Sequence, residues 1–176
     1  MIVLNFKDHP SISGKWDRFE LSRQNSRSWN VVGVNQDRIL GARVLELGSN
    51  EGRMSFAALQ YGAKSVVGVD RYKDNVNLCK QNCPDASFIQ SDIRDFLHTT
   101  DLEFDVVICS GVIYHLDEHM RVFEGLGRAV RKGAHTVILE TAVRDPDTPK
   151  NPCVSPLGHT MIWPLEKEVV EGAKLN

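Results

Sequence analysis

The sequence predicts an α/β fold in which helices flank a central, mostly parallel sheet, within a single domain that spans residues 1–176. Three observations support this prediction. Short apolar runs alternate with amphipathic stretches along the middle of the chain, which is the pattern of successive β-α-β units. The apolar run over 105–109 is rich in β-branched residues, which favour strands. A turn with glycines at Gly48 and Gly52 joins the first strong run to the next helix.

Each element follows from its periodicity and its boundary residues. Apolar runs of strand length occupy residues 43–47, 66–69, 87–90, 105–109 and 135–141. Amphipathic stretches that end at glycine or turn residues predict helices over 53–61, over 74–82, from Asp117 to Lys132–Gly133, and over 165–174. A proline-rich connection precedes the last of these helices.

Two of these helices have apolar positions that indicate how they pack. In the helix over 74–82, Cys79 and Cys83 share the spacing of Val76, so both thiols are expected in the core. Asp117 is a good N-cap residue for the later helix. The expected apolar face of that helix consists of Met120, Phe123, Leu126 and Val130.

The first forty residues are expected to form a helical segment that faces the substrate, ahead of a ligand-binding core over residues 41–176. Trp16, Phe19 and Leu21 predict one helix, and Trp29 is placed in a second. Residues 1–6 are an additional candidate strand.

Composition narrows the classes of function. The formal net charge is −2 and the pI is about 6.3, which provides no general attraction for nucleic acid. The sequence has no run of about 18 apolar residues, so no membrane span is expected. The four cysteines show no paired framework, which indicates a reduced, cytoplasmic setting.

The glycine turn and the acid after the next strand predict a nucleoside ligand. Glycines at 48 and 52 let a ligand approach the backbone closely, and Asn50 tolerates the left-handed conformation. Asp70 stands 22 residues after Gly48, at the end of the next strand. A carboxylate at this place can accept hydrogen bonds from the ribose hydroxyls.

The same turn separates two nucleoside ligands. Asn50 and Arg53 replace the second and third glycines of the dinucleotide fingerprint G-x-G-x-x-G. Glu46 and Glu51 place carboxylates beside the turn, where they would repel a pyrophosphate but attract a cationic sulfonium compound with an amino-acid tail. The residues therefore favour S-adenosylmethionine over NAD.

Four motifs in order resemble the class I S-adenosylmethionine-dependent methyltransferases, which have a Rossmann-like fold. These are Glu46-x-Gly48-x-x-x-Gly52, Asp70, Ser91-Asp92-Ile93 and the segment 104–116. The resemblance covers roughly residues 40–175. It implies methyl transfer from S-adenosylmethionine to a small-molecule or RNA nucleophile, with Asp70 on the ribose and the segment at Asp92 beside the adenine.

The resemblance also implies a set of site residues. Tyr114 and His115 are the expected catalytic residues, although Tyr114 is equally compatible with a pocket wall. The alternative role for Asp92 is an N-cap, while Asp105 is expected to be structural and Cys109 to pack inside the sheet. The expected cofactor-binding residues are Glu46, Gly48, Ser49, Asn50, Gly52, Asp70, Arg71, Asp92, Ile93 and Ser110.

Other functions stay open at this point. The segments Gly111-Val112-Ile113-Tyr114-His115 and Ile138-Leu139-Glu140-Thr141 resemble the branch that includes the tRNA wobble-uridine carboxymethyltransferases, which use carboxy-S-adenosylmethionine. A non-catalytic partner protein with the same fold and an NAD-dependent oxidoreductase are further alternatives.

No metal is expected, although one motif suggests zinc. His115-Leu116-Asp117-Glu118-His119 fits the pattern H-x-x-E-H. Because His115 precedes the expected cap Asp117, the two histidines are not expected on one helix, and no third ligand is evident.

The family fold normally closes with a C-terminal hairpin, which we expect to be missing from this sequence. An open sheet edge is normally covered. We therefore expect a second copy, a partner chain or residues 1–6 to lie along it.

Overall fold

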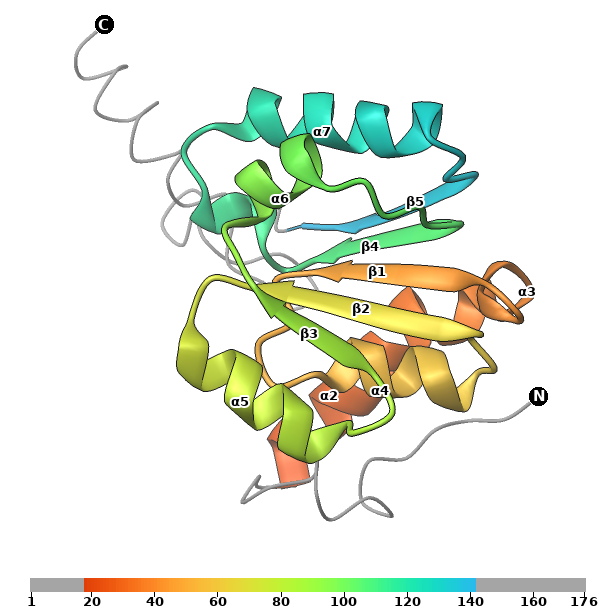
Figure 1. Ribbon diagram of the computed structural model, residues 1–176. Coiled ribbons are helices and arrows are strands. Elements are labelled where there is room, and N and C mark those ends of the chain that lie inside the picture. The colour runs from red at the N-terminus through yellow and green to blue at the C-terminus, as the bar shows by residue number, and fades with distance from the viewer. Residues whose placement is uncertain (1–17, 142–176) are drawn as a thin grey trace, which may run out of the picture.

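The computed structural model describes residues 18–141, which form a twisted parallel sheet between two layers of helices (Figure 1). The expectations for a strand over 1–6, for Trp16, for the proline-rich connection and for a helix over 165–174 lie outside the described residues. The strand order is β3-β2-β1-β4-β5, and every pairing is parallel. The strands are β1 Arg43–Leu47, β2 Ser65–Asp70, β3 Ser87–Gln90, β4 Val106–Ser110 and β5 Thr136–Glu140.

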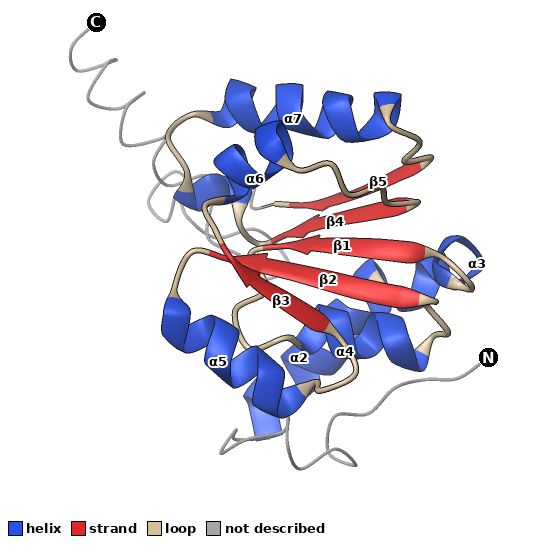
Figure 2. Ribbon diagram, viewed as in Figure 1, coloured by secondary structure: helices blue, strands red, loops and turns tan. Residues whose placement is uncertain are grey.

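Helices cover both faces of the sheet (Figure 2), which explains why its central strands are buried and mostly apolar. One layer contains the helices that precede and follow β1 and β2. This layer comprises α2 Arg18–Val31, α3 Gln36–Ile39, α4 Arg53–Gln60 and α5 Lys73–Asn82, with the short helix η2 Gly33–Asn35. The other layer comprises α6 Ile93–Thr99 and α7 His119–Arg131, and the short helix η3 Ile113–His115 leads into α7.

Side chains of β1 and β4 alternate between the two cores. Val44 and Ile108 pack with α2 and α4 on one face. Leu45 and Val107 pack with α6 and α7 on the other face. All of these side chains are essentially inaccessible to solvent, so the two central strands join the helical layers into one hydrophobic structure.

The predicted strands agree with the structure to within a residue or two at each end, as do the helices now labelled α4 and α5. Cys79 and Cys83 are buried beside Val76 and Phe88, which confirms their predicted packing. Cys109 is buried in β4, also as predicted.

The N-terminal segment differs from the prediction. Phe19, Leu21 and Trp29 lie on the single helix α2 rather than on two helices. No glycine or proline interrupts the sequence between Arg18 and Val31, so the helix continues without a break. No helix within residues 18–141 is long and apolar enough to cross a membrane.

Two predictions about α7 were wrong. The N-cap position of α7 is Glu118 rather than Asp117. Oδ1 of Asp117 accepts hydrogen bonds from the Glu118 amide and from the Arg94 guanidinium. The apolar face was also misplaced. Of the four residues expected in the core, only Leu126 is buried, whereas Met120, Phe123 and Val130 are 69%, 43% and 49% exposed.

A close approach between α6 and α7 explains the rotated face. A Cβ at Gly125 would lie 2.6 Å from the Cβ of Leu97, so the absence of a side chain at Gly125 allows α7 to approach α6 at this point. This contact turns Val122 and Leu126 into the core instead of their apolar neighbours.

Two valines on α7 provide a matched test of this orientation. Val122 is completely buried, whereas Val130 is 49% exposed. We expect Val122→Ala to lower the free energy of unfolding by about 1.5–3 kcal/mol, because it removes two buried methyl groups and leaves a cavity. Val130→Ala should change it by less than about 0.5 kcal/mol. Denaturant unfolding measures both, and equal losses would contradict the observed orientation.

Candidate functional site

A cavity lies at the carboxyl ends of β1, β2 and β4. The sheet order changes direction between β1 and β4, and α/β sheets bind ligands at such a point. The cavity volume is about 540 Å³, within the usual range for small-molecule sites. Its walls are formed by Gly48, Asn50, Asp70, Arg71, Tyr72, Asn75, Asp92, Ile93, Gly111, Val112, His115 and Leu116.

The turn after β1 forms the floor of this cavity. Its amides at Gly48 and Ser49 donate to the carbonyl of Val69, at 2.8 and 3.1 Å. Gly48 has a φ of 73° and Asn50 a φ of 49°, both in the left-handed region. A Cβ at Gly48 would lie 2.7 Å from Cγ2 of Val112. Glycine is therefore required here by the backbone conformation and by the neighbouring strand end.

Gly52, which is expected to contact the cofactor, lies at the end of the turn where α4 begins. It occupies the N-cap position of α4 with a φ of 82° and lines neither polar cavity. A Cβ there would meet Cys79 and Phe88 only at ordinary contact distances. The left-handed conformation of the turn accounts for glycine at this position.

Asp70 is held as a fixed acceptor at the end of β2. Its Oδ2 accepts a hydrogen bond from the amide of Asn50 at 2.9 Å. Its Oδ1 accepts from the amide of Tyr72 at 2.9 Å and from Nδ2 of Asn75 at 3.1 Å. The side chain is 6% exposed yet faces the cavity. A carboxylate has about four lone-pair positions, so acceptor capacity is left for a ligand.

Asp92 is the N-cap of α6, which confirms the alternative role predicted for it. Its Oδ1 accepts from the amide of Arg94 at 2.9 Å. The side-chain hydrogen bonds from Arg94 lower the pKa of Asp92. The same residue lines the cavity together with Ile93 and Arg71, so capping and ligand contact are compatible.

A second, smaller polar cavity of about 30 Å³ adjoins the first at Gly48 and Asn50. It contains Glu46, which is 4% exposed and accepts hydrogen bonds from the amide of Ser55 at 2.8 Å and from its hydroxyl. Burial raises the pKa of Glu46 to about 7. The buried hydroxyl of Ser49 has no hydrogen-bond partner among the described residues. Such a group normally indicates an absent polar partner.

Helix α2 reaches this second cavity from a distant part of the chain. Nη2 of Arg27 donates to Oγ of Ser110 and to Oε2 of Glu140, both at 2.9 Å. Ser110 in turn donates to Oε2 of Glu140 at 2.7 Å. The network connects α2 with the ends of β4 and β5.

The two predicted catalytic residues lie in η3, which follows β4. His115 lines the main cavity, and its partial burial lowers its pKa. Tyr114 is half-buried and does not line that cavity, although its ring contacts His115 at a centroid distance of 4.3 Å. Burial raises the pKa of Tyr114.

The histidines of the H-x-x-E-H pattern lie on separate elements, as expected. His115 ends η3 and His119 begins α7. No group of three or more His, Cys, Asp or Glu residues within residues 18–141 is arranged to hold a metal ion.

Several cavity residues were not predicted from the sequence. Gly111 could have been found, since it ends β4 with a φ of 67° much as Gly48 ends β1. Asn75 and Arg27 carry no local signal for their contacts, because their partners lie on other elements. The other missed lining residues include Tyr72, Val112, Leu116 and Gln24.

Glu46 generates a prediction about pH. In the unfolded chain this carboxyl ionises near its ordinary pKa of 4.5, whereas in the folded chain it holds its proton up to about pH 7. The folded state therefore binds more protons between these values, and its stability falls as pH rises. Relative to Glu46→Gln, we expect the wild type to lose about 3 kcal/mol of unfolding free energy between pH 4 and pH 8. Denaturant unfolding at several pH values measures this loss. Unfolding free energies of wild type and Glu46→Gln that change in parallel with pH would contradict the prediction.

Comparison with known proteins places this site in a family. A family model described as "Methyltransferase domain" matches residues 45–138, which is just over half of the 176 residues. The matched range runs from β1 to β5 and so contains most of the site.

Individual relatives agree with the family match. The chain is 29% identical over 143 residues to a tRNA U34 carboxymethyltransferase of Helicobacter acinonychis. The aligned region covers 76% of this chain and 50% of that protein. The chain is 22% identical over 134 residues to a ubiquinone biosynthesis O-methyltransferase of Proteus mirabilis, covering 71% and 54%. The chain thus spans about half the length of these curated relatives.

The fold is shared with solved structures. The crystal structure of magnesium protoporphyrin IX methyltransferase from Synechocystis, solved with bound SAH, superposes with a TM-score of 0.59 at 19% identity, over 80% of this chain and 68% of that one. The family match and the parallel sheet agree with the four motifs of the sequence. The chain belongs to the methyltransferase-domain family, within the class I S-adenosylmethionine-dependent methyltransferases.

Proposed function

We propose that this protein binds S-adenosylmethionine across the two neighbouring cavities and transfers its methyl group to a nucleophile. One observation carries the proposal. The larger cavity is bordered by Asp70 and Asp92, and it shares Gly48 and Asn50 with a small polar cavity. The small cavity contains Glu46 and the Ser49 hydroxyl, which has no hydrogen-bond partner within the described part of the chain. A nucleoside with a cationic amino-acid tail matches this arrangement of acceptors.

The residues divide according to the part of the cofactor that they would hold. Asp70 would accept from the ribose hydroxyls, and Asp92 with Ile93 would adjoin the adenine. Glu46 and Ser49 would hold the amino-acid end, where the ammonium group would favour the ionised form of Glu46. The remaining expected contacts are Gly48, Asn50, Arg71 and Ser110.

The protein contributes binding and orientation to the reaction. The cofactor supplies an electrophilic methyl group on a sulfonium sulfur. Val112 and Leu116 add apolar surface to the cavity wall, which helps to exclude water. His115 is neutral at physiological pH because its pKa is lowered, so its imidazole can accept a proton from the nucleophile. Tyr114 stays protonated because its pKa is raised, so its phenol can donate a hydrogen bond.

A second candidate is transfer of a carboxymethyl group from carboxy-S-adenosylmethionine. The observation that favours it is the similarity to proteins named tRNA U34 carboxymethyltransferase. We propose a cytoplasmic location for either activity, which agrees with the three free, buried cysteines of the described chain.

We also propose that another segment or a second subunit covers the outer edge of β5. Among the described strands, β5 pairs with β4 alone. The neighbouring groove includes the exposed apolar side chains of Met120, Phe123 and Leu139.

Calorimetry with S-adenosylmethionine, carboxy-S-adenosylmethionine and NAD tests the proposed function. We expect S-adenosylmethionine to bind and NAD not to bind. Mass spectrometry of the purified protein then identifies any co-purified ligand. Tighter binding of the carboxy compound would favour the second candidate, and binding of NAD alone would contradict both.

Asp70 provides a test with a matched control at the opposite end of the sheet. Asp70→Asn should weaken S-adenosylmethionine binding by about 1.5–3 kcal/mol, because the ribose loses a charged acceptor. Asp105 lies at the amino-terminal side of β4 and binds the Arg43 guanidinium at 2.9 Å. Asp105→Asn should therefore reduce stability but leave affinity unchanged. If Asp70→Asn binds S-adenosylmethionine as tightly as the wild type, Asp70 does not bind the ribose.

Gly48 and Gly41 form another matched pair, with φ values of 73° and 74°. At either position an added Cβ would destabilise the folded protein by about 1–2 kcal/mol through backbone strain. Only at Gly48 does it also collide with Val112, whereas at Gly41 it meets nothing within 4 Å. We expect Gly48→Ala to lose cofactor binding in calorimetry while Gly41→Ala retains it. Normal binding by a folded Gly48→Ala protein would refute the role of this turn.

A further inference from the structure

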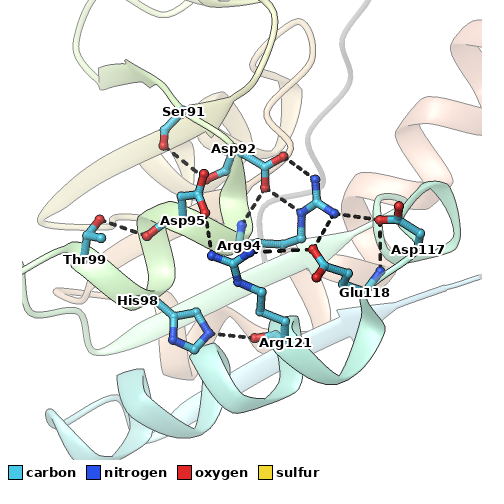
Figure 3. A network of polar contacts seen from close by, with 9 residues as sticks. All are labelled: Ser91, Asp92, Arg94, Asp95, His98, Thr99, Asp117, Glu118 and Arg121. Atoms are coloured by element: carbon cyan, nitrogen blue, oxygen red, sulfur yellow. Dashed lines mark hydrogen bonds and ion pairs between the residues drawn. The ribbon is translucent and has the colours of Figure 1, made fainter.

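Arg94, on the first turn of α6, is the centre of a network of charges (Figure 3), and its partner Asp92 lines the cavity. Its Nε and Nη2 donate to the two carboxylate oxygens of Asp92, at 2.9 and 2.7 Å. Its Nη1 donates to Asp117 at 2.6 Å and to Glu118 at 3.0 Å. One guanidinium therefore joins the residue that caps α6 to the loop that precedes α7.

The pairs within this network are not equivalent. The Asp92 pair has two parallel hydrogen bonds, and its side chains are only 24% and 19% exposed. Such forked geometry holds a carboxylate in one orientation. The carboxylates of Asp117 and Glu118 are 68% and 54% exposed, so water screens them and their pairs contribute little. The orientation of Asp92 is therefore the main consequence of Arg94.

The contacts leave one part of the Asp92 carboxylate available. Oδ1 accepts from the Arg94 amide and from Nε, whereas Oδ2 accepts from Nη2 as its single partner within residues 18–141. Oδ2 thus has an unused lone-pair position on a residue that lines the cavity. A carboxylate held in this way accepts hydrogen bonds and donates none, so it favours an amino group and repels a carbonyl oxygen.

We propose that Arg94 is a positioning residue that sets the preference of the site for a 6-aminopurine over a 6-oxopurine, by fixing the acceptor Asp92. This inference rests on the proposed binding of an adenosyl cofactor. Arg94 itself does not line the cavity, so its effect is transmitted through Asp92.

Arg121 is the matched control within the same network. Its guanidinium pairs with Asp95 at 2.7 Å and with Glu118 at 3.6 Å. None of these three residues lines the main cavity, and Arg121 is 42% exposed. Arg121→Gln removes a charge from the network without touching Asp92. The double variant Asp117→Asn/Glu118→Gln removes the other partners of Arg94 and leaves its fork on Asp92 intact.

The experiment compares S-adenosylhomocysteine with S-inosylhomocysteine, in which an oxo group replaces the 6-amino group of the purine and N1 carries a hydrogen. Calorimetry gives both dissociation constants for each variant. The wild type should prefer the amino compound by at least about tenfold. In Arg94→Gln, the dissociation constant for S-adenosylhomocysteine should rise about five- to thirtyfold. The dissociation constant for S-inosylhomocysteine should rise less, so the preference for the amino compound over the oxo compound becomes smaller.

The other variants separate positioning from general stabilisation. Arg121→Gln and the double variant should keep the wild-type ratio of the two dissociation constants within about twofold. Arg94→Lys should give an intermediate ratio, because lysine keeps the charge but not the fork. It also provides the decisive measurement if thermal melting shows that Arg94→Gln is unfolded. Asp92→Asn, which can both donate and accept, should narrow the ratio as well.

The inference is overturned if Arg94→Gln leaves the ratio of the two dissociation constants unchanged, which includes equal weakening of both ligands. It is also overturned if Arg121→Gln narrows this ratio to the same extent as Arg94→Gln. An unchanged ratio in Arg94→Lys, when that variant replaces an unfolded glutamine variant, overturns it too. Failure of the wild type to bind either ligand would instead refute the proposed function, so the two failures are distinguishable.

Discussion

The hydrogen bonds that tie the turn after β1 to the end of β2 are the constraint on which the site depends. Val69 supplies one carbonyl that accepts two turn amides, and the Asp70 side chain accepts the next amide. This arrangement requires the parallel register that places Leu47 beside Val69. It also requires left-handed backbone at Gly48 and Asn50, which directs their amides toward β2. Without it, the cavity floor and the orientation of Asp70 would both be lost.

Each carboxylate at the site is held by a different kind of partner, and its electrostatics follow from that partner. Asp92 is paired with an arginine, which lowers its pKa. Burial raises the pKa of Glu46, and the hydrogen bonds that it accepts from Ser55 offset this rise only in part. In the proposed function these groups are oriented before a ligand arrives, which reduces the cost of ordering them on binding. Arg27 performs a similar task for Glu140 at the end of β5.

Most of the fold and much of the site could be predicted, because the relevant signals are local. Parallel strands buried on both faces appear as apolar runs, and their carboxyl ends meet at one edge. Acids or glycines placed directly after these runs, such as Asp70 and Gly48, therefore lie together in the structure. The capping role of Asp92 follows from its place directly before a helix. By the same logic, Gly111, which follows β4 directly, could have been predicted as a residue of the cavity.

The sequence by itself determined the strands, the left-handed turn and the edge at which its acidic residues gather, since each depends on neighbouring residues and on strand direction. Only the tertiary structure decided which face of α7 points inward, because that depends on how closely Gly125 approaches Leu97 on another helix. It also decided that Arg27 and Arg94 bind carboxylates on other elements. Contacts between residues far apart in the chain leave no periodic pattern in the sequence, so the packed structure alone specifies them.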